Sequence, residues 1–206
     1  MTGAGSVKLI DAATLENRHV RLEPFAESHR EALRAAGNDG NLWAFASLNQ
    51  YNADFDSWFD AALSEMAKGE RVAFTVLAQP SDAIAGSTSY LNIVPAQKRL
   101  EIGWTWYAKP FWAGAVNPSC KLLLMQHAFE TLKLIRVELK CDARNARSRD
   151  AIARLGAKEE GTLRHHMILP DGHLRDTVYF SVLAEEWPGV KHGLEQRLKR
   201  IAATRP

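Results

Sequence analysis

The sequence predicts an α+β fold with an α/β-like arrangement of three layers, in which helices cover both faces of a mixed central sheet. Along its 206 residues, apolar positions switch repeatedly between helical spacing and strand alternation. A strand–helix–strand order in the second half indicates that part of the sheet is parallel. Two strand-like runs flank Pro170-Asp-Gly172, which is a turn sequence and predicts a closing hairpin.

In the first half, a short strand over 20–24 precedes a helix over 26–36. Asp54 or Asp56 is suited to cap a second helix that ends near Met66. Three strand patterns follow, over 71–78, 84–93 and 100–107.

In the second half, Asn117 is a good N-cap, and Pro118 at the first helical position predicts a helix that runs to Leu132. Because this helix is apolar nearly all round, we expect it to lie between layers. A strand over 135–141 leads to a helix capped by Asn145 and closed by Gly156. The hairpin strands cover 161–169 and 173–183, and a last helix covers 188–201.

The length predicts one domain over 18–187, preceded by an extension over 1–17 and followed by a C-terminal helix and basic tail over 188–206. With 26 basic and 24 acidic residues, the formal charge of +2 excludes a polybasic coat protein and an acidic-tail protein. From residue 190 onward, five basic residues stand against one acid, so the body of the chain is slightly acidic.

Cys120 and Cys141 lie in apolar runs, which predicts buried, reduced thiols. Residues 1–6 have no apolar core and do not resemble a signal peptide. The apolar run over 122–125, like every other in the sequence, is far shorter than the roughly 20 residues of a membrane span. We therefore expect a cytoplasmic protein.

The first candidate site is the turn over 111–118, between a strand and a helix. Its small residues permit close approach of a phosphate to the backbone, and a helix N-terminus attracts anions. Lys121 opposes the helix dipole in the first turn, which a bound anion would convert into attraction. The alternative is that Lys121 extends its ammonium to solvent.

The second candidate is the start of the next helix, where Asn145 and Ser148 stand at the N-cap and N3 positions. Capping alone explains both residues. Arg144, Arg147 and Arg149 crowd the same turn, either as a solvated basic rim or as a phosphate clamp shared with the first turn.

The third candidate is Glu101, on a central strand. Alternation predicts that Leu100, Ile102, Trp104 and Trp106 share one face of this strand, and that Glu101, Gly103, Thr105 and Tyr107 share the other. A carboxylate in mid-sheet is a candidate general base or the structural partner of an arginine.

Metal and nucleotide motifs are missing from the sequence. His165 and His166 lack metal-ligand spacing to any cysteine or acid cluster, so we expect them on the surface or at a sheet edge. There is no nucleophile elbow, Walker loop or full dinucleotide fingerprint.

The element order, with Leu100-Glu-Ile-Gly-Trp followed by the turn and the buried helix, resembles the GNAT superfamily of acyl-CoA-dependent N-acetyltransferases. The likeness is strongest to its ribosomal-protein N-terminal (Rim-type) branch and covers about 18–190. Asn145-Ala-Arg-Ser148 followed by Ala151-Ile-Ala-Arg-Leu-Gly-Ala157 is the most specific segment.

This resemblance implies a sheet that splits between the fourth and fifth strands to admit acetyl-CoA as co-substrate, with no metal. Glu101 matches the position of a general base, and Ser148 matches a hydroxyl that protonates the departing thiolate. The implied cofactor-binding residues are Trp104, Thr105, Trp106, Trp112, Gly114, Ala115, Val116, Asn117, Lys121, Asn145 and Ser148.

One segment departs from the superfamily. Its pyrophosphate loop has Gln or Arg, two free positions, Gly, one free position, then Gly or Ala. Aligned on Ala113, Val116 and Pro118, this pattern lacks both the Gln or Arg and the central Gly.

The function that follows is direct acetyl transfer to a primary amine, either a protein N-terminus or a small molecule. Trp43, Phe45, Tyr51 and Trp58 are candidates for the wall of the acceptor pocket, although core packing explains some of them. One alternative is a catalytically impaired CoA-binding or regulatory module. A nucleic-acid contact through the basic tail and Arg144–Arg149 is a weaker one. The family likeness also suggests a homodimer.

Overall fold

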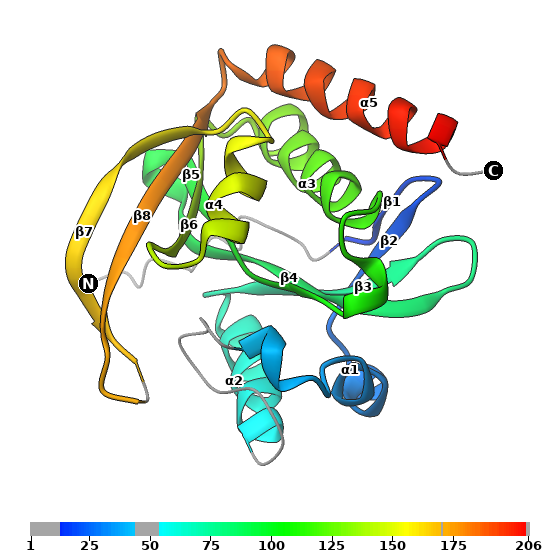
Figure 1. Cartoon of the computed structure of the whole chain (residues 1–206), viewed down its shortest axis with the longest axis vertical. Coiled ribbons are helices and arrows are strands. Elements are labelled where there is room, and N and C mark those ends of the chain that lie inside the picture. The colour runs from blue at the N-terminus through cyan, green and yellow to red at the C-terminus, as the bar shows by residue number, and fades with distance from the viewer. Residues whose placement is uncertain (1–12, 44–53, 170, 205–206) are drawn as a thin grey trace, which may run out of the picture.

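The computed structural model describes residues 13–43, 54–169 and 171–204, and these form one mixed sheet of eight strands (Figure 1). The strand order is β1-β2-β3-β4-β5-β6-β8-β7, and within the described ranges only β5 and β6 pair in parallel. The strands are β1 (Leu15–Glu16), β2 (Val20–Pro24), β3 (Val72–Ala78), β4 (Ala83–Val94), β5 (Arg99–Tyr107), β6 (Arg136–Asp142), β7 (Lys158–Ile168) and β8 (Leu174–Leu183).

Helices cover both faces of the sheet, which confirms the predicted fold class. α1 (Arg30–Ala36) and α2 (Asp54–Lys68) lie on one face, and α3 (Val116–Gln126), α4 (Ala146–Ala153) and α5 (Trp187–Thr204) lie on the other (Figure 1). A π-helical turn over His127–Thr131 extends α3, so the helical path ends close to the predicted Leu132.

Two hydrophobic clusters hold the layers together. The larger packs α3 and α5 on the sheet, so α3 is buried between layers as predicted, and α5 adds Trp187, Val190 and Leu194 to this core. The smaller lies under α1 and α2 and is rich in aromatic rings. Its buried members are Phe25, Leu33, Trp43, Phe55, Trp58, Phe59, Ala62, Ala73 and Trp106.

The predicted start of α3 was wrong by two residues. The helix begins at Val116 with Ala115 as N-cap, and Asn117 and Pro118 lie inside its first turn. A proline is tolerated there because the first four N–H groups of a helix have no intrahelical acceptor. Pro118 therefore predicted the first turn of the helix correctly, but not the residue at which the helix begins.

The predicted faces of β5 were also wrong beyond Gly103. Trp104 has a left-handed φ of 49°, and the pairing with β4 shifts between Ser87 and Ser89. This bulge adds one residue and reverses the alternation. Leu100 and Ile102 belong to the larger cluster, whereas Trp104 and Trp106 pack in the smaller one.

Strands β5 and β6 pair over only three residues each, from Arg99 opposite Arg136 to Glu101 opposite Glu138. Both strands continue beyond this point without pairing to each other. The split predicted for the fourth and fifth strands is therefore confirmed. The two strands count as fifth and sixth because the two-residue β1, which sequence patterns did not predict, precedes them.

Candidate functional site

The turn before α3 contains a residue with backbone strain. Ala113 has a φ of 56°, in the left-handed region that favours glycine. An alignment of the pyrophosphate pattern three residues earlier than the one on Ala113, Val116 and Pro118 fits this backbone. It puts the pattern's glycine on Ala113, its last small position on Ala115, and its Gln or Arg on Pro110.

The start of α4 is built as predicted. The Asn145 side chain accepts a hydrogen bond from the Ser148 backbone N–H at 3.0 Å, which caps the helix. Gly156 has a φ of 91° and lies three residues beyond the end of α4. The guanidinium of Arg147 lies 3.9 Å from the ring centroid of Trp112, in the turn before α3. The structure thus brings the two candidate turns together.

The other two arginines of this turn form ion pairs. Arg144 contacts Asp142 at 2.8 Å, and Arg149 contacts Glu159 at 3.2 Å. Burial alone would raise the pKa of Asp142, but its hydrogen bonds with Arg144 outweigh burial, and the net shift is downward. Of the three arginines, Arg147 is therefore the one whose guanidinium lies against the turn before α3.

Lys121 is buried, with 4% of its surface exposed, so the alternative that it extends to solvent is wrong. Its Nζ donates a hydrogen bond to Thr105 Oγ1 at 3.0 Å, and that hydroxyl lies 2.8 Å from Thr88 Oγ1. Burial lowers the pKa of Lys121 to about 8. The ammonium thus lies against β5 rather than in solvent. Because α3 begins at Val116, Lys121 lies in its second turn, and the prediction that it opposes the helix dipole in the first turn was wrong.

Glu101 occupies the end of the β5–β6 ladder, and its side chain is almost completely buried. Lys140 Nζ lies 3.0 Å from Glu101 Oε2, and Asn92 Nδ2 donates to the same oxygen at 2.8 Å. The structure thus gives both expected features, burial and an ionic partner. The cation in contact is a lysine instead of the expected arginine.

Ser148 lies near the thiol of Cys141, and a hydrogen bond between the two side chains acts on that thiol. Burial raises the pKa of Cys141, and the hydrogen bond with Ser148 opposes this. Cys120 and Cys141 are both free and buried, as predicted. Ser148 therefore lies beside the far end of β6, and Glu101 lies where β6 leaves the β5 ladder.

Two of the aromatic residues expected around an acceptor are core residues. Trp43 and Trp58 are buried in the smaller cluster, and Trp43 Nε1 donates to the Gly37 carbonyl at 3.0 Å. Phe45 and Tyr51 lie outside the described residues.

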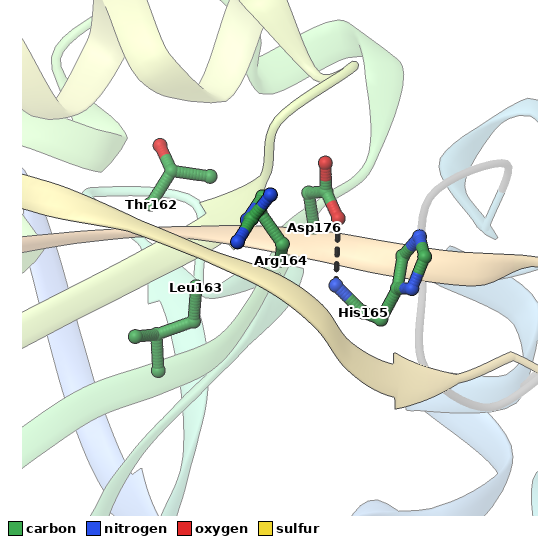
Figure 2. Close-up of a pocket in the computed structure, with 5 residues that line it drawn as sticks. All are labelled: Thr162, Leu163, Arg164, His165 and Asp176. Carbon is green, nitrogen blue, oxygen red and sulfur yellow. Dashed lines mark hydrogen bonds between the residues drawn. The ribbon is translucent and has the colours of Figure 1, made fainter.

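The hairpin of β7 and β8 carries a hollow of about 610 Å³, lined by Thr162, Leu163, Arg164, His165 and Asp176 (Figure 2). Figure 2 shows Leu163 on the opposite side of β7 from Thr162. His165 and His166 are exposed on this edge strand, as predicted. Among the described residues, no group of His, Cys, Asp or Glu has the arrangement of a metal site. Nor does the described part of the chain contain a helix that is long and apolar enough to cross a bilayer.

Sequence reasoning missed the polar residues around Glu101. Asn92 has a left-handed φ of 46° beside an irregular β4–β5 pairing, which no sequence period indicates. Lys140 had a usable signal, because Glu138 and Lys140 alternate with the apolar Val137, Leu139 and Cys141. This pattern places Lys140 on the same face as Glu138, and the parallel ladder places Glu138 opposite Glu101.

Comparison with known proteins identifies one family. Residues 19–158 match the family described as "Acetyltransferase (GNAT) domain". The protein named "Putative ribosomal N-acetyltransferase YdaF" of Bacillus subtilis is 36% identical over 110 residues, or 53% of this chain. The alignment spans 58% of that relative's length.

Solved structures agree with this match. A GCN5-related N-acetyltransferase from Brucella melitensis is 31% identical, with a TM-score of 0.84 over 92% of this chain and 86% of that one. Mycobacterium smegmatis RimJ in complex with CoA-disulfide has a TM-score of 0.75 over 90% and 93% of the two chains. At 21% identity, that likeness shows the fold alone.

Proposed function

The chain belongs to the GNAT acetyltransferase family, and from this membership we propose that it is an acetyl-CoA-dependent N-acetyltransferase whose acceptor is a primary amine. The observation that carries the proposal is the buried carboxylate of Glu101 at the point where β5 and β6 part. A carboxylate in this position is suited to take a proton from an amine that enters the split.

The residues around the split fit acetyl-CoA. Beyond Glu101, the β5 backbone no longer pairs with β6, so its polar groups on that side are open to a ligand over 104–106. Arg147 over Trp112 places a cation between the N-termini of α3 and α4, an arrangement that suits a diphosphate. In this proposal, the turn from Trp112 to Asn117 holds the diphosphate, with Lys121 behind it.

Asn145 and Ser148 complete the set at the thiol end. Bound acetyl-CoA would supply an acetyl group activated as a thioester. Glu101 takes the proton that the acceptor amine loses, and N–H groups of β5 polarise the carbonyl on which the amine forms its new bond. As the carbon–sulfur bond breaks, the Ser148 hydroxyl donates a proton to the leaving sulfur.

The acceptor in this proposal is a protein N-terminus, because the YdaF relative is named as a ribosomal N-acetyltransferase. A small-molecule amine is the other possibility that the sequence analysis retained. Cytoplasmic location and a homodimer belong to the same proposal. The exposed edge strand β7 is the surface that we assign to the second copy.

We predict that acetyl-CoA and a suitable amine release free thiol in the presence of the purified chain. A panel of peptides with free N-termini, the same peptides with blocked N-termini, a polyamine and an aminoglycoside identifies the acceptor class.

Glu101→Gln is expected to lower turnover by about 100-fold or more, since general bases contribute at least that factor. Its affinity for acetyl-CoA, measured by calorimetry, should change little.

Equal turnover rates for the unmodified chain and Glu101→Gln across pH would remove Glu101 from the mechanism. Binding of acetyl-CoA without thiol release on any amine would favour the regulatory module instead. The observation that supports the regulatory module is Pro110, which supplies no side-chain donor at the Gln or Arg position of the pyrophosphate pattern.

A further inference from the structure

The contacts of the Glu101 carboxylate are asymmetric. Lys140 Nζ at 3.0 Å and Asn92 Nδ2 at 2.8 Å both lie on Oε2. The other oxygen, Oε1, is directed toward Gly103, where an added Cβ would lie only 2.8 Å from it. One oxygen is therefore held by two donors, and the other lies over a residue without a side chain.

The lysine of this pair comes from the strand on the other side of the split. Lys140 lies on β6, two residues beyond the last β5–β6 pair, and its side chain is partly exposed while that of Glu101 is buried. Its ammonium also lies 5.8 Å from the ring centroid of Tyr179 on β8. Lys140 thus reaches the buried carboxylate from a partly exposed position, with its ammonium beside an aromatic ring.

Other charges face this pair from each neighbouring strand. Arg175 on β8 interacts electrostatically with Glu101. Glu138 on β6 lies 2.8 Å from Arg136 and 3.3 Å from Arg99, so two guanidinium groups compensate its charge. Asn92 on β4 is uncharged. Among the described residues, the ion pair of Glu101 is therefore the one with Lys140, and Arg175 adds an electrostatic interaction.

We infer that Lys140 is a positioning residue for Glu101, a role that rests on the function proposed above. By holding Oε2, Lys140 and Asn92 fix the carboxylate so that Oε1 is directed toward Gly103 and accepts the proton of the acceptor amine. Lys140 thus orients the carboxylate without touching the acceptor.

Three substitutions test this positioning role. Lys140→Met removes charge and donor, Lys140→Gln keeps a donor, and Lys140→Arg keeps the charge. Because Lys140 does not touch acetyl-CoA or the acceptor in this proposal, the Met variant is expected to lose kcat while the KM for each substrate stays nearly unchanged. The Arg variant should retain most of the kcat of the unmodified chain.

Loss of position is expected to lower kcat by up to about 100-fold in the Met variant, and by less in the Gln variant. Lys191→Met is the matched control, because it breaks the ion pair of Lys191 on α5 with Glu130. It should change neither KM nor kcat.

Each outcome decides the assignment. An unchanged kcat in Lys140→Met, when the unmodified chain releases thiol, overturns the positioning role and leaves the proposed function intact. A lower melting temperature with an unchanged kcat also overturns it, since that result indicates a structural role alone. Absence of thiol release from the unmodified chain with every amine contradicts the proposed function instead. If Lys140→Met does not fold, the Gln and Arg variants still test the donor.

Discussion

Lys121 is a buried cation in the second turn of α3. Burial removes water from its ammonium, which disfavours the charged form. Its ammonium donates a hydrogen bond to the hydroxyl of Thr105, which is neutral. The lysine therefore costs stability at neutral pH.

We predict that Lys121→Met stabilises the chain at pH 7. The pKa of Lys121 falls from 10.5 to about 8 on folding, so at neutral pH its removal is worth on the order of 3 kcal/mol. Urea unfolding at several pH values measures this. Methionine keeps the length of the apolar stem and removes the charge.

The pH dependence has a definite sign. Below pH 8 both states carry the proton and the cost is complete, whereas between pH 8 and 10.5 the folded state releases the proton first. Stability from this group therefore rises with pH across that window. The rise should be absent in Lys121→Met and present in Lys191→Met. The same pH slope in all three proteins would contradict a lowered pKa.

At the residue scale, Asn145 and Glu101 lie where capping and strand period predicted them. Asn145 caps α4, and Glu101 is buried in mid-sheet. Their partners were not predicted, because Lys140 reaches Glu101 across a parallel ladder that connects β5 and β6, far apart in sequence. A single sequence gives no register between such strands.

At the element scale, the bulge of β5 depends on a close approach by β4. Gly86 has a φ of 149°, and a Cβ there would lie 2.1 Å from the Trp106 carbonyl oxygen. No side chain fits that space. Glycine at this position therefore permits the shift in β4–β5 register that turns Trp104 and Trp106 to the face of the sheet opposite Leu100 and Ile102.

We predict that Gly86→Ala lowers the free energy of unfolding by about 3 kcal/mol, through overlap with backbone and a disfavoured φ. Gly193→Ala in α5 is the control, since nothing lies within 4 Å of its added Cβ. That variant should gain about 1 kcal/mol from helix propensity. Chemical denaturation measures both. If Gly86→Ala is as stable as the unmodified chain, β4 does not hold the bulge in place.

Bulges and turns account for most errors at this scale. Period-2 alternation predicted the existence of β5 but failed after Gly103, because an inserted residue leaves no mark in the sequence pattern. Likewise, Asn117 and Pro118 predicted a helix start but not its first residue.

At the scale of the whole molecule, the hairpin of β7 and β8 projects from the body (Figure 1). β7 is an edge strand on which nearly every residue is exposed, including Leu163 and Ile168. An edge with exposed apolar side chains tends to pair with another chain.

We predict that the chain is a dimer and that Ile168→Lys converts it to a monomer. Ile168 is 74% exposed on the edge strand, whereas Ile135 is 54% exposed just before β6. Ile135→Lys is therefore the matched control and should leave the dimer intact. Light scattering after gel filtration measures the mass. A monomeric unmodified chain at micromolar concentration, or a dimeric Ile168→Lys variant, would refute the assignment.

The architecture was largely predictable from the sequence, because the order of helical and strand periods indicated a mixed sheet with helices on both faces. The two-residue β1 was not, since so short a strand has no period. The segments at 44–53 and 1–12 lie outside the described residues, so the expectations for Phe45, Tyr51 and the start of the chain stay predictions.

The three-residue ladder between β5 and β6 also has a mechanical consequence. Over the described residues, the sheet consists of two halves, β1 to β5 and β6 to β8, which are joined only by the short ladder that ends at Glu101 and Glu138. Beyond this ladder, each half can unfold locally without breaking the hydrogen bonds of the other. A ligand that contacts both halves therefore couples their local unfolding, so its binding free energy makes the sheet unfold more cooperatively.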